Sequence, residues 1–204
     1  GQKGFNGTAI LSKLPLEDVV RRLPGDDGDE QARYIEATVT PAGGGSVRIA
    51  CLYLPNGNPI DTPKFSYKLA WMERLRVHAE ALLADETAFV LAGDFNVIPE
   101  PIDAKRPEAW VHDALFQPES RGAWRRLVSL GLTDATRACH PEPGLYTFWD
   151  YQAGAFQKND GIRIDHVLLS AAAADLMSAA GIDKHVRSWD KPSDHVPVWV
   201  EFKA

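Results

Sequence analysis

The residues best suited to chemistry lie in the closing segment KPSDHVPVW (191–199), where Asp194 and His195 stand together before an expected strand. Two further segments, GDFNVIP (93–99) and GIRIDHVLLS (161–170), each add a carboxylate next to an apolar run. Metal-assisted cleavage of a phosphodiester needs this combination, because acidic oxygens hold Mg²⁺ while an imidazole meets the charged phosphate. The sequence therefore predicts phosphodiester chemistry at a site built from three distant segments.

Asp94 and Asn96 follow the short apolar run at 88–92, which is typical of a strand covered on both faces. Side chains two positions apart on a strand point to the same side. Asp94 could then accept a proton from water or bind a metal, and Asn96 could donate to a phosphate oxygen. An Asx turn that closes the strand is an equally open interpretation.

Asp165 interrupts the apolar strand expected at 164–169. A carboxylate there costs free energy unless it is paired or bound to a metal, and His195 is the candidate partner. Pairing would fix the imidazole tautomer and favour the protonated ring. A structural role, in which Asp165 accepts from a loop amide, is the alternative. His166 is expected to face the opposite side in a structural role.

Asp194 and Tyr53 complete the candidate groups. Asp194 would assist the metal or its waters beside the imidazole. Tyr53 ends an expected strand just before the turn residues Pro55, Asn56 and Gly57, where its phenol could donate to a phosphate oxygen. From the residues alone, packing of the Tyr53 ring at the rim of the core is the stronger interpretation.

The elements that must position these residues are mixed strands and helices. Alternating apolar residues predict strands at 33–40 and 46–54, joined by a Pro-Gly break into a hairpin. Helical periodicity is clearest from Lys64 to Leu83, with Lys68 outside the apolar stripe. This order predicts two sheets flanked by helices. The other expected strands are 8–12, 88–92, 146–149, 164–169, 182–188 and 197–202, and the other expected helices are 120–130 and 171–179.

The composition favours one core and a single domain over 1–204, because 45% of the 204 residues are apolar. The net charge of −6 has the wrong sign for a generic nucleic-acid binder, although three arginines gather at 121–126. No apolar run approaches the roughly 20 residues that span a bilayer, and the first residues lack a signal-peptide pattern. Cys51 and Cys139 stand far apart, which fits a reducing cytoplasm.

Taken in order, these segments resemble the exodeoxyribonuclease III family within the endonuclease/exonuclease/phosphatase superfamily. The resemblance runs over essentially the whole chain. It rests on GQKGFNGTAILSK (1–13), the strand that begins at Arg33, YLPNG (53–57), KFSYKLAWMERL (64–75), GDFN (93–96), WRRLVSLGLTDATR (124–137), YTFWDYQ (146–152), NDGIRIDHVLLS (159–170) and KPSDHVPVW (191–199).

The resemblance implies a role for each matched position. Asp94 matches the residue that activates or positions the attacking water, and Asp165 matches the carboxylate paired with the catalytic imidazole, here His195. Tyr53 matches the phosphate-contacting tyrosine. The implied metal ligands are Asp194, Asp94 and Asn96. The implied substrate-binding residues are Asn96, Asn56, Arg33 and Lys64, with Phe148 and Trp149 in the loop that packs near the sugar of an abasic or terminal nucleotide.

The family fold is a four-layer α/β sandwich of the deoxyribonuclease I type, with two mixed β-sheets flanked by helices. Its members use Mg²⁺ or Mn²⁺ to cleave double-stranded DNA, removing nucleotides or blocking groups from 3′ ends and incising 5′ to abasic sites. The resemblance therefore implies a DNA repair nuclease with 3′-to-5′ exonuclease and abasic-site endonuclease activity. We expect a cytoplasmic monomer that acts on duplex DNA and not on membranes.

Family members carry a further segment before the GQKG-like start. It holds an Asn on the first strand and a Gln-Glu motif whose Glu is the principal metal ligand. The sequence begins at Gly1 and contains no Leu-Gln-Glu motif. We therefore expect an N-terminally incomplete chain, with weakened metal affinity, slower turnover and an open sheet edge.

Two other functions stay open. A phosphatase or phosphodiesterase of the superfamily that acts on a phosphoinositide or sphingomyelin would share the GDFN and SDH segments, whereas WMERL, GLTDATR and YTFWDY favour DNA repair. A catalytically inactive module that binds DNA or a protein would fit the absent Gln-Glu motif. Such a module has no need of the acids at Asp94, Asp165 and Asp194.

Overall fold

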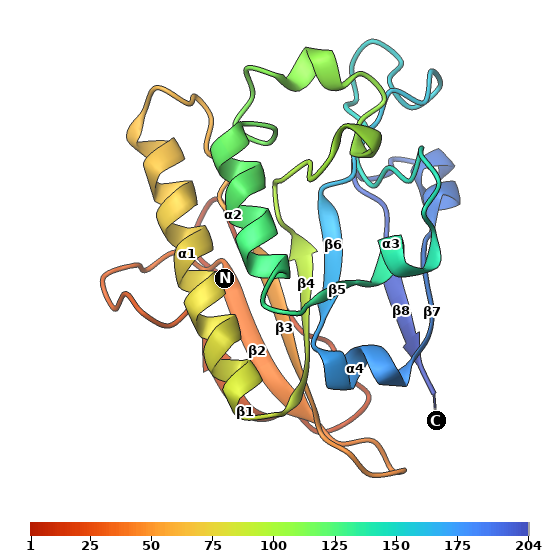
Figure 1. The fold of residues 1–204 in the computed structure, drawn as a ribbon. Coiled ribbons are helices and arrows are strands. Elements are labelled where there is room, and N and C mark those ends of the chain that lie inside the picture. Colours follow the sequence, from red (N-terminus) through yellow and green to blue (C-terminus); the bar gives the residue numbers. More distant parts are fainter. Residues whose placement is uncertain (204) are drawn as a thin grey trace.

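The computed structural model describes residues 1–203 as an α/β sandwich of two sheets, and residue 204 lies outside the described part (Figure 1). The larger sheet has the order β1-β2-β3-β4-β6-β5, with β3 and β4 parallel and the other neighbours antiparallel. The smaller sheet is the antiparallel pair β7 and β8. The strands are β1 (Glu17–Arg21), β2 (Tyr34–Val39), β3 (Val47–Tyr53), β4 (Ala88–Asp94), β5 (Thr133–Asp134), β6 (Asp165–Leu169), β7 (Met177–Ile182) and β8 (Val198–Phe202). The helices are α1 (Pro63–Ala84), α2 (Pro118–Val128), α3 (Ala135–Cys139) and α4 (Ala171–Leu176), with 3₁₀ turns at Pro101–Asp103, Pro107–Trp110 and Lys184–Ser188.

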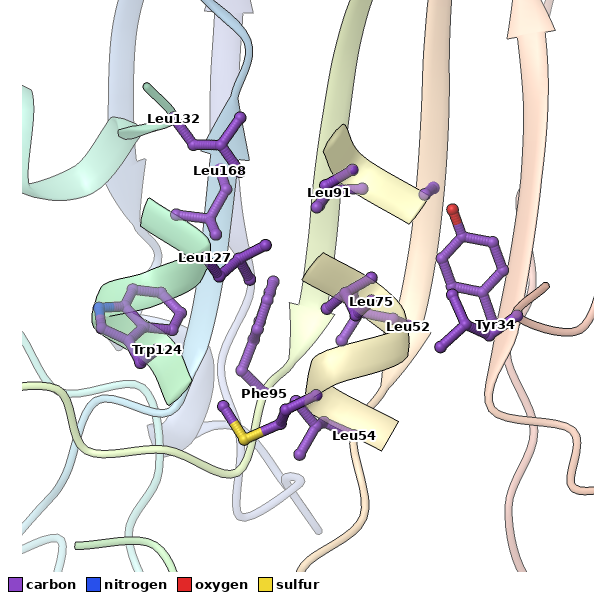
Figure 2. Close-up of a cluster of buried hydrophobic side chains, with 14 of the residues drawn as sticks. Tyr34, Leu52, Leu54, Leu75, Leu91, Phe95, Trp124, Leu127, Leu132 and Leu168 are labelled. Atoms are coloured by element: carbon purple, nitrogen blue, oxygen red, sulfur yellow. The ribbon is translucent and has the colours of Figure 1, made fainter. Parts of the chain in front are cut away.

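Helices α1 and α2 cover one face of the larger sheet, and the main core fills the space between them and the strands (Figure 1). Leu75 of α1 lies beside Leu52 on the sheet, and Trp124 of α2 packs edge-on against Phe95 (Figure 2). Each large apolar side chain buried in this way contributes about 1.5–3 kcal/mol. No helix within residues 1–203 combines the length and apolarity needed to cross a membrane.

The opposite face of the larger sheet packs against the small sheet. Val90 and Val167 contact a cluster that includes Ala173 of α4 and Ala180 of β7. Strand β4 is therefore covered on both faces, as its unbroken apolar run predicts. The predicted α/β sandwich is confirmed, although within residues 1–203 only the larger sheet is mixed. A single domain over 1–204 stays a prediction.

Three of the predicted strands are wrong. Residues 8–12 form no strand, and the first strand is β1. Residues 146–149 make isolated bridges and backbone hydrogen bonds between loops. The predicted strand 182–188 is mostly a 3₁₀ turn that follows β7. Strand β7 ends at Ile182, because Pro197, which precedes its partner strand β8, has no amide hydrogen with which to continue the pairing.

The helix predicted over 171–179 begins correctly and ends early. Ser170 caps α4, because its hydroxyl accepts from the Ala173 amide. After Leu176 the chain becomes extended and enters β7, although alanine favours a helix. Ala180 is buried there against the larger sheet, so pairing with β8 overrides the local preference.

Candidate active site

One end of the larger sheet gathers four of the predicted site residues in a row. Tyr53 ends β3, Asp94 ends β4 and Asp165 begins β6. In the register of the sheet, Asp94 pairs with Tyr53 on one side and with Asp165 on the other. Arg33 extends the row, since its carbonyl accepts from the Tyr53 amide at 2.8 Å and its guanidinium carbon lies 5.0 Å from the Tyr53 ring centroid. Segments that are distant in sequence thus meet because of strand pairing.

Gly93 allows this row to form. Its φ is +142°, and a Cβ atom at this position would lie 2.0 Å from the Leu52 carbonyl oxygen. Only glycine tolerates so close a backbone approach. The glycine of the GDFN segment therefore sets the position of the Asp94 carboxylate that follows it.

Asp94 and Asn96 are bonded to each other. Asp94 Oδ1 accepts from the Asn96 amide at 2.8 Å, and Oδ2 accepts from Asn96 Nδ2 at 3.1 Å. The Asx turn considered as the alternative is therefore present, and it coexists with adjacent side chains. Asn96 Nδ2 also donates to the Leu54 carbonyl, while its Oδ1 accepts from Asn56 Nδ2 at 3.1 Å. Because both amide hydrogens of Asn96 are engaged, it orients Asp94, and a phosphate contact would require it to exchange one of these bonds.

Asp165 and His195 form a hydrogen-bonded pair, with His195 Nδ1 at 2.8 Å from Asp165 Oδ2. Burial disfavours the charged imidazole. The hydrogen bond and charge of Asp165 outweigh this effect and, with the charges of Asp94 and Asp194, raise the pKa of the imidazole to about 9. The ring is therefore cationic at neutral pH, in the form that attracts a phosphate.

At Asp94 the surroundings favour the neutral form of the side chain, whereas at His195 they favour the charged form. Burial, followed by the charge of Asp165, raises the pKa of Asp94 to about 7, although the charge of His195 partly offsets the increase. Neighbouring carboxylates disfavour each other's ionisation. This end of the sheet therefore carries an excess of acidic groups that a proton or a cation would balance.

Phe148 joins the two loops that flank the pair. Its backbone bridges Ile162 on one side and His195 on the other. Its ring centroid lies 5.0 Å from that of His195. The side chain is half-buried and borders the candidate site, and its predicted contact with a sugar stays a prediction.

Trp149 takes a different place from the one predicted. Its side chain is 0% exposed and packs with Tyr146, Ala155 and Val196. A ring without exposed surface has no direct contact with a substrate, so the substrate-binding role predicted for Trp149 is wrong in this structure. The indole fills the small core beneath the loop.

Two residues that the sequence analysis missed support the row. Lys68, predicted on the outside of its helix, is 0% exposed, and its Nζ donates to the Asn96 and Pro55 carbonyls at 2.6 and 3.1 Å. Burial lowers the pKa of Lys68 to about 7, against the charges of nearby carboxylates. Thr147 Oγ1 accepts from the Asp165 amide at 3.1 Å and so fixes the start of β6.

The signal for Lys68 was its spacing, four positions before the buried Met72 and on the same face of α1. Lys64, the lysine that was predicted to bind substrate, is exposed one turn earlier. Within residues 1–203 no hydrogen bond connects its side chain to the row. Thr147 gave no such signal, because its role depends on a contact with a distant strand.

The predicted metal ligands Asp194, Asp94 and Asn96 supply oxygen donors, which hard cations such as Mg²⁺ prefer. The uncompensated acidic groups around Asp94 are of the type that binds a cation. Among residues 1–203, however, no three His, Cys, Asp or Glu side chains converge as a metal site requires. The described side chains thus form part of a donor set and do not enclose an ion by themselves.

The model of the endonuclease/exonuclease/phosphatase family matches residues 1–195. The chain belongs to this family. Exodeoxyribonuclease III of Haemophilus influenzae is 32% identical over 211 residues, covering 100% of this chain and 79% of that protein. As a member of the family, the chain is a hydrolase of the nuclease and phosphodiesterase type, and the family is metal-dependent.

Solved structures of other family members share the fold. A 3′ phosphatase from Neisseria, bound to a product DNA hairpin, has a TM-score of 0.88 at 37% identity, covering 95% of this chain and 73% of that one. An AP endonuclease from Archaeoglobus fulgidus has a TM-score of 0.85 at 34% identity, covering 94% and 72%. The predicted deoxyribonuclease I-like fold and the resemblance to the exodeoxyribonuclease III family are confirmed.

Proposed function

We propose that this family member is a DNA repair nuclease that hydrolyses phosphodiester bonds of duplex DNA at abasic sites and at 3′ ends. The observation that carries the proposal is the Asp165–His195 hydrogen bond next to Asp94 at one end of the sheet. A cationic imidazole beside an acid with a raised pKa suits attack on a phosphodiester. The imidazole binds the phosphate, and the acid positions the attacking water and accepts its proton. The names of the relatives, which include an exodeoxyribonuclease III and an AP endonuclease, support DNA as the substrate.

In the proposed mechanism, Asp94 aligns and deprotonates the attacking water. Its pKa of about 7 suits a general base at neutral pH. His195, held by Asp165, places positive charge on a phosphate oxygen and stabilises the charge that develops there. Tyr53 donates to another phosphate oxygen from the next strand. The product would carry a 3′-hydroxyl.

The other predicted residues hold the DNA. Arg33 and Lys64 supply positive charge to the phosphate backbone. Asn56 contacts the phosphate directly and orients Asn96 through their hydrogen bond. The ring of Phe148 packs against the sugar of the abasic or terminal nucleotide.

We propose Mg²⁺, or Mn²⁺ in its place, as the cofactor, held in part by Asp194, Asp94 and Asn96. The ion supplies positive charge at the phosphate when it is bound. Residues 1–203 orient Asp94 and His195 by their own hydrogen bonds, so this geometry does not depend on the ion. A monomeric state and a cytoplasmic location stay predictions.

The test is cleavage of a duplex oligonucleotide that contains one abasic-site analogue, next to a blunt duplex and a duplex with a 3′-phosphate. The wild type is expected to incise or shorten DNA in Mg²⁺ or Mn²⁺, and Asp94→Asn is expected to lose this activity while keeping its melting temperature. Release of phosphate from an inositol phosphate, without cleavage of any DNA, would instead support the phosphatase alternative. DNA binding without turnover in either metal would support the inactive binding module.

A further inference from the structure

A hollow lies on the loops that follow Trp149 and precede Asp194. It has a volume of about 650 Å³ and runs between the loop of residues 150–159 and the turn of residues 184–192. In Figure 1 these are the cyan loop and the dark-blue turn at the upper right. A volume in this range accommodates a small organic ligand or a nucleotide. We call this hollow the 151/189 groove, after its two exposed aromatic residues.

Tyr151 and Trp189 offer the groove two accessible rings, one from each wall. Their side chains are 62% and 63% exposed, which is unusual for large aromatic residues. Both are held in place, because Tyr151 Oη donates to the Pro192 carbonyl at 2.9 Å and the Trp189 ring packs edge-on against His185. Fixed, exposed aromatic faces are the surfaces on which unpaired nucleobases stack.

Two cations line the same groove. Arg187 lies 4.8 Å from the Tyr151 ring centroid, and its Nη2 donates to a backbone carbonyl. The Arg187 side chain is 7% exposed, so its charge acts on the groove from beneath the surface. Lys184 Nζ is bonded to Asn159 Oδ1 at 2.7 Å and adds a second charge. Among the described residues that line the groove, Asp150 is the single acid beside the two cations, so the lining is positive although the chain has a net charge of −6.

The groove is joined to the candidate active site through the backbone. The Trp149 amide donates to the Asp194 carbonyl at 2.9 Å, and Phe148 contacts the His195 ring. These two residues directly precede Asp150 and Tyr151 in the groove wall. The wall of the groove therefore continues directly from the loop that borders the candidate active site.

We propose that the 151/189 groove binds one unpaired nucleotide of the DNA strand, with the base stacked on Trp189 and Tyr151 and the phosphate near Lys184 and Arg187. This inference rests on the proposed DNA substrate and extends it to strand ends that are frayed or overhanging. Stacking of one base on an aromatic side chain changes affinity by roughly 5- to 100-fold. The groove therefore gives a strand with an unpaired end an advantage over a blunt duplex.

The experiment measures dissociation constants in EDTA, by fluorescence anisotropy, for a labelled blunt duplex and for the same duplex with a short 3′ overhang. The wild type is expected to bind the overhang more tightly. Trp189→Ala should weaken overhang binding by roughly 5- to 100-fold and leave blunt binding unchanged, whereas Trp189→Phe should retain most of the preference. Lys184→Ala should lower the salt dependence of overhang binding by about one phosphate contact. Lys203→Ala, which removes an exposed lysine just after β8, should leave the salt dependence unchanged.

An unchanged ratio of overhang to blunt affinity in Trp189→Ala, with an unchanged melting temperature, would overturn the groove proposal. Cleavage of abasic DNA is measured separately in Mg²⁺ and Mn²⁺. If the wild type cleaves DNA and the ratio is unchanged, the groove proposal alone fails. If no DNA is cleaved but Trp189→Ala loses the overhang preference, the proposed nuclease fails and the nucleotide groove stands.

Discussion

Two groups of buried charges meet near the start of β6, and they differ in how their charges are balanced. In the first, which we call the arginine cluster, Arg163 donates to Asp103 at 2.7 Å and to Asp134 at 2.8 Å, and Arg137 donates to Asp103 at 2.5 Å. Two acids thus face two guanidinium groups. In the second, the candidate active site, Asp94 and Asp165 share the single imidazole of His195.

The difference separates a structural network from a chemical one. Arg163 holds the pKa of Asp103 below its ordinary value, although burial acts in the opposite direction. At Asp94 the pKa moves upward instead, since burial and a neighbouring acid prevail. His166 belongs to the arginine cluster. Burial and the charge of Arg163 lower its pKa to about 4, so it stays neutral, as its predicted structural role requires. Removal of one member of a balanced buried pair destabilises a fold because the other charge is left uncompensated, whereas groups with an unbalanced charge are candidates for binding and catalysis.

Loss of the imidazole in the candidate active site is expected to have the greatest effect. His195→Ala is expected to lower kcat on abasic duplex DNA by roughly 10²- to 10⁴-fold, because a positioned acid or base contributes that much. The melting temperature should stay close to that of the wild type, since His195 is partly exposed. An unchanged kcat would remove His195 from the mechanism.

The matching substitution in the arginine cluster is Arg163→Met. It leaves Asp103 and Asp134 buried without their main partner, so we expect a loss of about 3–5 kcal/mol in the free energy of unfolding. Urea denaturation measures this loss. Arg125→Met, which removes an exposed ion pair with Glu100, is the control and should cost less than about 1 kcal/mol. Equal effects of the two variants would contradict the structural role of the cluster.

Lys68→Met tests the support beneath the candidate active site. It leaves the Asn96 and Pro55 carbonyls without their donor, so we expect a loss of about 1–3 kcal/mol in unfolding free energy. The rate should fall as well, because Asn96 orients Asp94. Lys64→Met, one turn earlier and exposed, should leave stability unchanged and raise KM for DNA. A stable Lys68→Met variant with normal kcat would show that the row does not depend on this lysine.

The smallest expected effect is the pH dependence of the arginine cluster. The folded-state pKa of Asp103 lies below its ordinary value of 3.8, so its contribution to stability is complete above about pH 4 and is lost as the pH falls further. Asp103→Asn removes this contribution. The difference in unfolding free energy between wild type and variant should therefore shrink from pH 6 to pH 3. A constant difference over this range would contradict the pairing.

Local patterns were enough to find the elements that carry the site. The apolar run before Asp94 predicted a strand covered on both faces, and the isolated carboxylate at Asp165 predicted pairing with His195; both agree with the observed geometry. Long-range packing was harder to predict. Ala-rich residues became β7 because β8 was available to pair with them, and Lys68 and Trp149 were buried by contacts with distant segments.

The residue types at the strand ends follow from the amino-acid order alone. Hydrophobic runs predict the strands, and the polar residues that border these runs must then lie at the ends of the strands. The need for glycine at position 93 comes from the fold, because the Leu52 carbonyl of the neighbouring strand leaves no room for a Cβ atom. The placement of Asp94 and Asp165 near one imidazole, and of Trp189 and Tyr151 along one positive groove, depends instead on the folded chain. These arrangements depend on strand pairing and loop contacts between distant segments, which no local periodicity encodes.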